Sequence, residues 1–548
     1  MKQLLPLVLI VAALLLETRK SSAQLEYIPS VEAQITDTPQ LGGVFILNTM
    51  DFRPAASLPA LFPSSLQVID PQYPWPPLFF ANAQPGGTGF VGNGMYMDVR
   101  VSENLNQLSF FFGTQSDSGA ASGKYYFADT SSFIVLDSFV DAAYRIDAHD
   151  LQLNNAGEKL YMKNFDTIVD VSALSGNSAD TSFLLTTQRI EIIDSNDVVV
   201  FSWNPLDFLP LSATYQGFSR QGFVLDFYSG FDWSHGNSAR FAQDGNILYS
   251  YRNVGMGKVD RHNGNLLWQF AGKKPDMVPP GNAYPYNQHD FKEIAPGIYT
   301  VFANGNDTTP CKAIVYLINE ANSSVKVLNN YQPSPPIISR GLGNFDMLEN
   351  GLCLVNYGAY ASFARQKTFG IHDTTTGNLL AEYSLPGLTF SYQVHHVPAW
   401  KPARPSIVNE SNMLHVDGAG SGVSWYQLLD TALIHLSDSS AYAPADSGVF
   451  LATVETGFGY LVSETIQFTK DSLIDAIIAP EIKAQTNLFY VADRKIKSEK
   501  YRGIYSVLTS DGRVAWTGRG ACDLSNFSSQ LFFVKTPSGY LQKLMLMH

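Results

Sequence analysis

The chain has 548 residues, of which 45% are hydrophobic and 13% aromatic, enough for several domains with a sizeable core. Its formal net charge of −13 excludes a general nucleic-acid binder, because such proteins meet phosphates with basic surfaces. Its three cysteines, Cys311, Cys353 and Cys522, are too few and too widely spaced for a disulfide framework or a cysteine metal site.

Residues 1–23 have the pattern of a secretory signal peptide. Met1-Lys2 precedes an apolar run from Leu4 to Leu16, and small residues lead to a cleavage site after Ala23. The apolar run is about 13 residues long, too short to span a bilayer comfortably. We therefore expect a mature protein that is secreted, periplasmic or held at the cell surface, with an uncleaved anchor as the alternative.

A repeated pattern organises the first 400 residues. An apolar strand ends in an acidic or amide residue, a few loop residues follow, and a second apolar strand begins. The six residues that end these strands are 54 to 66 positions apart: Asp70, Asp129, Asp194, Asp260, Asn319 and Asp373. Such units are typical of β-hairpins, and six of them predict an all-β fold with a six-bladed β-propeller over residues 42–400.

The pattern changes after the proline-containing stretch 401–405, which we take as a linker. Alternating strands predict an immunoglobulin-like β region over residues 406–468, short for a full sandwich. Residues 485–548 predict a further small β domain with a hairpin from Tyr505 to Trp516. This end is either a capping pair of hairpins or a C-terminal sorting domain. Its hairpin and its terminal Lys-Leu-aliphatic strand resemble the sorting domains of type IX secretion substrates. That resemblance implies contact with secretion machinery or the cell surface.

Three histidines lie at matching places in three successive repeats. His149, His235 and His289 each begin a short apolar run that ends in a glycine turn. If the repeats are blades around one axis, these histidines converge on a single pocket. Three histidines also suit zinc, so a metal-dependent lyase or hydrolase remains an alternative at this point.

Two polar residues accompany the histidines. Asn237 is two residues after His235, and on a strand both would face the same side. Arg252 ends the next apolar run, and its planar fork suits a tetrahedral oxyanion such as sulfate or phosphate. The arginine favours an anion over a metal as the ligand.

Residues 60–400 resemble the arylsulfotransferases that work without PAPS, the nucleotide sulfate donor. The densest match runs from Asp232-Trp-Ser-His-Gly-Asn-Ser through Ser-Tyr-Arg252 to Val259-Asp260 and Gly264-Asn-Leu-Leu-Trp268. Asp147-Ala-His-Asp150 and Gln288-His-Asp290 add to it. The Asp-Asn-Gly run of many family members is Ala303-Asn304-Gly305 here.

The resemblance implies a secreted propeller that moves a sulfuryl group from a phenolic sulfate ester to a phenol, with no cofactor and no metal. It implies that His289 is the sulfate-accepting nucleophile and that His235, Asn237 and Arg252 hold the sulfuryl group. It implies that His149 contacts the phenolic oxygen. The alternative from another class is a non-catalytic binding propeller at the cell surface. A quinoprotein dehydrogenase fits less well, because regular tryptophan-docking repeats and adjacent cysteines are missing.

Overall fold

The computed structural model describes the chain in two units, residues 1–468 and 469–548. In the first unit it describes Leu25 and residues 28–468, apart from 38, 40, 52–63, 83–93, 116–120, 141–145, 219–229, 360–365, 418–421 and 430–431. In the second it describes residue 469 and seven short strands between residues 490 and 545. The expected signal peptide, residues 1–23, lies outside the described residues.

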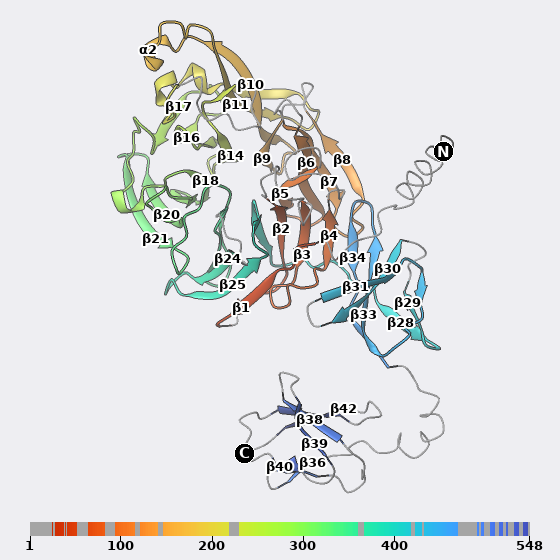
Figure 1. Ribbon diagram of the computed structural model, residues 1–548. Helices are drawn as coiled ribbons and strands as arrows, with labels where there is room; N and C mark the ends of the chain where they lie inside the picture. Colours follow the sequence, from red (N-terminus) through yellow and green to blue (C-terminus); the bar gives the residue numbers. More distant parts are fainter. Residues whose placement is uncertain are drawn as a thin grey trace, which may run out of the picture. The chain divides into compact units, whose positions relative to one another are not determined.

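The first unit contains six antiparallel sheets of about four strands that surround one axis (Figure 1). We call these sheets blades. They are given below in their order around the axis, and the strands of each blade are given from the inner to the outer one. Blade 1 is β27 (Val394–Val397), β2 (Val44–Asp51), β3 (Ser65–Ile69) and β4 (Phe79–Asn82); blade 2 is β5 (Met95–Val101), β6 (Gln107–Gln115), β7 (Ala121–Asp129) and β8 (Val135–Phe139); blade 3 is β9 (Ile146–Leu153), β10 (Lys159–Val169), β11 (Phe183–Ile193) and β12 (Val199–Trp203). Blade 4 is β14 (Gly236–Phe241), β15 (Ile247–Tyr251), β16 (Gly255–Val259) and β17 (Leu266–Phe270); blade 5 is β18 (Gln288–Ala295), β19 (Ile298–Ala303), β20 (Lys312–Asn319) and β21 (Ser324–Tyr331); blade 6 is β22 (Phe345–Met347), β23 (Leu352–Asn356), β24 (Gln366–Asp373) and β25 (Leu379–Leu385).

The ends of the propeller are joined by two strand exchanges. The inner strand of blade 1, β27, comes from the end of the propeller sequence and pairs with β2 from its beginning, Val44 opposite Val397. Strand β1 (Glu32–Ile35), which precedes β2, pairs with β25 at the outer edge of blade 6. Inner or second strands of neighbouring blades contact one another around the whole ring: β27 with β5, β5 with β9, β9 with β14, β14 with β18, β19 with β22, and β23 with β27. The predicted all-β fold with six blades is therefore confirmed.

The six residues that marked the sequence repeat all end or directly follow the third strand of a blade. Each side-chain oxygen accepts hydrogen bonds from backbone N–H groups two to four residues later; Asp129 Oδ1, for example, accepts from Ser131 N at 3.1 Å and Ser132 N at 2.7 Å. The same arrangement occurs at Asp373 and Asp260. A short carboxylate or amide side chain closes a turn in this way more strongly than a hydroxyl does, which accounts for the Asp or Asn in the repeat.

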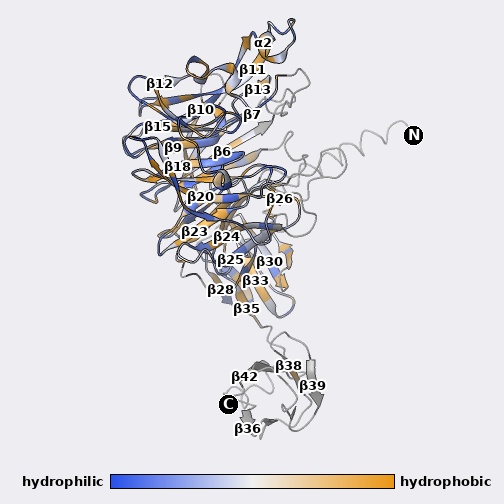
Figure 2. Ribbon diagram, turned by 90° about the vertical axis from the view of Figure 1, so that its left-hand side faces the viewer, coloured by the Kyte–Doolittle hydropathy of each residue, from blue (hydrophilic) through white to orange (hydrophobic). Residues whose placement is uncertain are grey.

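Buried aromatic side chains fill the spaces between blades. Trp203 of blade 3, for instance, lies 5.2 Å between ring centres from Tyr249 of blade 4 and donates its indole N–H to Gly264 O. Phe369 and Tyr383 stack at 4.4 Å within blade 6. Hydrophobic and hydrophilic stretches are interspersed along the ribbons of the first unit in Figure 2, as expected for blades that are buried on both faces and have polar turns at their ends.

Residues 407–468 continue the sheet of blade 1. Strand β34 (Tyr460–Val462) pairs with β4, and beyond it lie β33 (Gly448–Glu455), β30 (Val423–Leu429) and β31 (Ala432–Ser437). A three-stranded sheet of β28 (Ile407–Glu410), β29 (Met413–Val416) and β32 (Ala441–Tyr442) packs against this extension. The shared core includes the buried side chains of Leu414, Trp425 and Phe450. The region is thus a two-sheet structure that shares a sheet with the propeller.

The second unit has two small antiparallel sheets. Strands β38 (Tyr505–Thr509) and β39 (Val514–Gly518) form the hairpin expected from the sequence, and β38 also pairs with β41 (Leu531–Lys535), beside which lies β42 (Leu541–Met545). The other sheet consists of β36 (Tyr490–Ala492), β37 (Lys495–Lys497) and β40 (Cys522–Asp523). The function of this unit as a sorting domain stays a prediction.

One line of ion pairs joins the inner strands of all six blades, and we call it the axial charge belt. Its members, in order, are Asp98, Arg100, Asp150, Arg240, Asp290, Lys292, Asp346 and His395. Acidic and basic side chains alternate along it, with each neighbouring pair 2.5 to 3.0 Å apart. Arg240 lies at its centre, with Nε 2.8 Å from Asp150 and Nη2 3.0 Å from Asp290.

In the described part of the chain, no helix combines the length and the apolar character that a membrane crossing requires.

Replacement of Arg240 by methionine is expected to destabilise the propeller strongly. The side chains of Asp150 and Asp290 are 0% and 1% exposed, so each would lose a buried cationic partner. Removing one partner of a buried ion pair costs about 3–5 kcal/mol. The control is Lys401→Met, which breaks an ion pair with Asp70 that is half exposed at the lysine and should cost about 0–1 kcal/mol. Denaturant unfolding of both variants measures the loss in the free energy of unfolding, and equal losses in the two variants would contradict this prediction.

Candidate active site

The three histidines occur at the same end of three adjacent inner strands. His149 lies in β9, His235 immediately precedes β14, and His289 is the second residue of β18. Strand β14 contacts both β9 and β18. The rings of His149 and His235 are 5.7 Å apart between centres. The structure therefore brings together residues 140 positions apart in the sequence, as the repeat predicted.

The hydrogen bonds around His289 determine which ring nitrogen carries the proton. Its Nδ1 lies 2.5 Å from Asn304 Oδ1, just after β19. The amide nitrogen of Asn304 donates to Ser339 Oγ at 2.8 Å and to Leu342 O at 2.9 Å, so Oδ1 is the atom that faces the imidazole. An amide oxygen only accepts hydrogen bonds, so Nδ1 of a neutral His289 must carry the proton. Its Nε2 is then the unprotonated atom with a free lone pair.

The environment of His289 also keeps its ring neutral. The side chain is buried, with 2% of its surface exposed. Burial lowers the pKa of His289 well below the usual value, and the positive charges of Arg252, His235 and His149 lower it further. The four side chains therefore form one electrostatic cluster. A neutral imidazole at physiological pH is a nucleophile.

His149 has the opposite electrostatic character. Its Nδ1 is 2.6 Å from Asp147 Oδ1 on the same strand. Burial opposes the charged form of His149, but the carboxylates of Asp147, Asp232 and Asp98, Asp147 foremost, together raise the pKa of His149 above the usual value. Because Nδ1–H donates to the carboxylate, protonated His149 presents Nε2–H as a second donor. Two histidines with pKa values moved in opposite directions are suited to different roles, one as a base or nucleophile and one as an acid.

His235 and Arg252 are tied to each other through the backbone. The Arg252 N–H donates to His235 O at 2.9 Å, and the guanidinium Nη2 donates to Arg340 O at 2.8 Å. His235 Nδ1 lies 2.6 Å from Asp232 Oδ2, and the same carboxylate accepts from the His235 backbone N–H through Oδ1. These bonds support a φ of 48° at His235, a left-handed conformation that non-glycine residues rarely adopt.

Asn237 differs from its expected arrangement. Because His235 lies outside β14 and the pairing shifts between Gly236 and Ser238, simple strand alternation does not relate the side chains of His235 and Asn237. The amide nitrogen of Asn237 donates to Gln288 O at 2.6 Å, one residue before His289. The structure thus shows Asn237 joining blade 4 to blade 5 beside His289.

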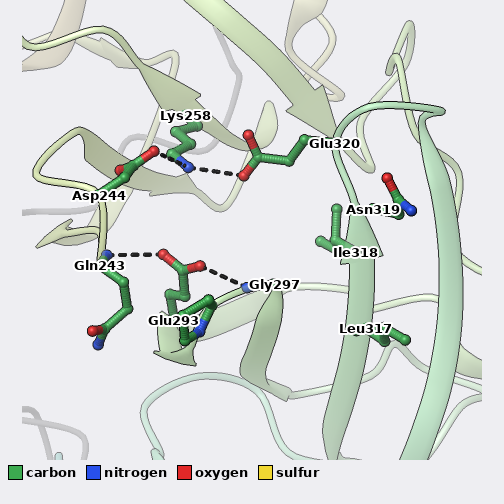
Figure 3. Close-up of a pocket in the computed structure, with 10 residues that line it drawn as sticks. Gln243, Asp244, Lys258, Glu293, Gly297, Leu317, Ile318, Asn319 and Glu320 are labelled. Carbon is green, nitrogen blue, oxygen red and sulfur yellow. Dashed lines mark hydrogen bonds and ion pairs between the residues drawn. The ribbon is translucent and has the colours of Figure 1, made fainter.

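A hollow lies between blades 4 and 5 at the opposite ends of these strands and contains none of the predicted site residues (Figure 3). Its volume is about 500 Å³. The Lys258 ammonium bridges Asp244 at 2.6 Å and Glu320 at 2.8 Å, and Glu293 accepts from the backbone of Gln243 and Gly297. The charged groups that line it therefore satisfy one another.

Sequence reasoning missed three residues that set the chemistry of the site: Asn304, Asp147 and Asp232. The two aspartates were visible in the sequence two and three residues before their histidines. Asn304 was present in the Ala303-Asn304-Gly305 run, but its link to His289 depends on the pairing of β18 with β19. Among the described residues, no group of three or more His, Cys, Asp and Glu side chains is arranged to hold a metal ion.

Comparison with solved structures finds several matches, including a propeller domain, but all at low TM-score and low sequence identity. The WD40 beta propeller domain of Doa1 has a TM-score of 0.26 and 12% identity, over 59% of this chain and 93% of that one. A putative 6-phosphogluconolactonase from Bacteroides uniformis ATCC 8492 has a TM-score of 0.34 and 10% identity, over 65% of this chain and 100% of that one. Neither likeness supports an inference about this chain. Comparison with curated proteins gives no match.

A comparison with protein families gives a specific result. Residues 102–368 match the family model described as Arylsulfotransferase (ASST). The matched segment contains all five predicted site residues as well as Asn304, Asp147 and Asp232. This segment, just under half of the chain, therefore resembles the arylsulfotransferase family.

Proposed function

We propose that the protein transfers a sulfuryl group from a phenolic sulfate ester to a phenol in two steps, through a sulfohistidine at His289. The observation that carries the proposal is the hydrogen bond from His289 Nδ1 to Asn304, which leaves Nε2 unprotonated in a buried, cation-rich site. The match of residues 102–368 to the arylsulfotransferase family supports a sulfuryl transfer and small phenolic substrates.

In the first step, the Nε2 lone pair of His289 forms a bond to the sulfur of the aryl sulfate. The bond between sulfur and the aryl oxygen breaks, and its electron pair stays on the phenolate. Protonated His149 gives its Nε2 proton to this oxygen, so the phenol leaves and His149 becomes neutral. Nδ1–H of His289 keeps its hydrogen bond to Asn304 while the ring becomes positively charged.

In the second step, a phenol acceptor enters and neutral His149 takes its proton. The phenolate oxygen attacks the sulfur, the bond from sulfur to Nε2 breaks, and His289 returns to its neutral form. Arg252 and the imidazole of His235 stabilise the charge on the sulfuryl oxygens in both steps. Asn237 helps indirectly by fixing the backbone of Gln288 next to the nucleophile.

Export is part of the proposal. The pattern of residues 1–23 supports it, and a secreted enzyme would gain from a reaction that takes its sulfuryl group directly from an ester. The C-terminal unit would then attach the protein to secretion machinery or to the cell surface.

The test of the function is release of 4-nitrophenol from 4-nitrophenyl sulfate by residues 24–548, with excess phenol and without PAPS. We expect release that depends on phenol and that falls by on the order of 10³-fold or more in His289→Ala, because the nucleophile is lost. The control is His262→Ala, an exposed histidine in the turn between β16 and β17. A folded protein that releases nothing from a panel of aryl sulfates would favour the non-catalytic binding propeller.

Asp147→Asn should move only the alkaline limb of the pH profile. The substitution removes the carboxylate that raises the pKa of His149, so His149 loses its proton at a lower pH. Activity requires protonated His149 in the first step and is therefore expected to decline at a lower pH than in the wild type. The pH dependence of kcat/KM for the sulfate donor measures this. An unchanged alkaline limb would assign the general acid elsewhere.

Asn304→Asp should move the acidic limb of the pH profile. A carboxylate in place of the amide would stabilise the imidazolium, so the pKa of His289 would rise. His289 would then be protonated and unreactive at pH values where the wild-type nucleophile is neutral, and the acidic limb of kcat/KM should shift to higher pH. The alkaline limb should stay in place. A uniform loss of rate without this shift would show that Asn304 does not control the ionisation of the nucleophile.

A further inference from the structure

Three tyrosines and a lysine form an exposed cluster between blades 4 and 5, which we call the tyrosine platform: Tyr215, Tyr284, Tyr286 and Lys273. The hydroxyls of Tyr215 and Tyr284 are 2.8 Å apart, and the rings of Tyr284 and Tyr286 are 4.7 Å apart between centres. The Lys273 ammonium lies 5.8 Å from the centre of the Tyr215 ring. The cluster gathers residues of two loops that are about 70 positions apart.

Backbone hydrogen bonds fix this platform beside the candidate site. Tyr215 N donates to Asn253 O at 2.7 Å, and Asn253 follows Arg252 directly. Tyr286 O accepts from Gly305 N at 3.0 Å, and Gly305 follows Asn304, the partner of His289. The platform therefore lies at the same end of blades 4 and 5 as the nucleophile and the arginine.

The platform exposes aromatic surface whose orientation is already fixed. Tyr215 is 51% exposed and Tyr286 is 39% exposed. Tyr284 has a second anchor, because its hydroxyl oxygen accepts from Gly272 N at 2.9 Å. Tyrosine rings held by their hydroxyls lose little conformational entropy when a ligand stacks on them.

We propose that the tyrosine platform binds the outer ring of a substrate with two or more aromatic rings, while the ring that carries the reacting oxygen lies at His289. Ring faces of the tyrosines supply stacking, and the ammonium of Lys273 attracts an anionic substituent on the outer ring. The substrate class is thus an extended phenol or aryl sulfate with negative charge, in preference to a single-ring phenol. This rests on the proposed function for the identity of the reaction.

The test uses sulfonates, which mimic aryl sulfates but whose carbon–sulfur bond is not transferred, so binding is measured without turnover. Calorimetry compares naphthalene-2-sulfonate with benzenesulfonate on residues 24–548. We expect the two-ring ligand to bind about tenfold more tightly, the range of one well-placed aromatic contact. In the variant Tyr215→Ala with Tyr286→Ala this ratio should fall to about two or less.

The control is Tyr73→Ala, which removes a tyrosine that is 74% exposed in the turn between β3 and β4 and should leave the ratio unchanged. If the double variant does not fold, Tyr286→Leu replaces it and should lower the ratio in part. A wild-type ratio near one, or a ratio that survives the double substitution, overturns the platform. The outcome is separate from the nitrophenol assay: an inactive protein with the expected ratio would refute the proposed function alone.

Discussion

The axial charge belt is the constraint on which the candidate site depends. Two of its carboxylates, Asp150 and Asp290, directly follow His149 and His289, and Arg240 holds both of them. The arginine therefore links the strands that carry His149 and His289, the proposed acid and nucleophile. A buried belt of this kind adds little net stability, because desolvation offsets its attraction, but it allows one arrangement of strands and makes others costly.

Side-chain hydrogen bonds also fix the three histidine rings. All three rings use Nδ1 for a fixed partner: Asp147 and Asp232 lie two and three residues before their histidines, and Asn304 follows the neighbouring strand. At His149 the carboxylate partner favours the imidazolium, whereas burial and nearby cations keep the pKa of His289 low beside its amide partner. Two similar residues thus acquire pKa values shifted in opposite directions from their surroundings.

Strand exchange at the ends of the propeller keeps this geometry closed. Strand β27 supplies both the inner strand of blade 1 and His395, the last member of the belt. It also follows Tyr392, whose hydroxyl donates to His149 O at 3.0 Å. The end of the propeller sequence therefore supports the site although all of the predicted site residues lie at least 100 positions before it.

The sequence by itself determined the number of blades, because each blade needs a short acceptor side chain to close the turn after its third strand, and Asp70 and its five equivalents are readable without a structure. It also determined the three histidines, through their equivalent places in the repeat. Only the tertiary structure decided their roles. The tautomer of His289 depends on Asn304 across a strand pair, and the position of His235 depends on a left-handed residue outside the strand. Such hydrogen bonds and backbone bends are set by neighbouring strands, and a one-dimensional pattern carries no record of them.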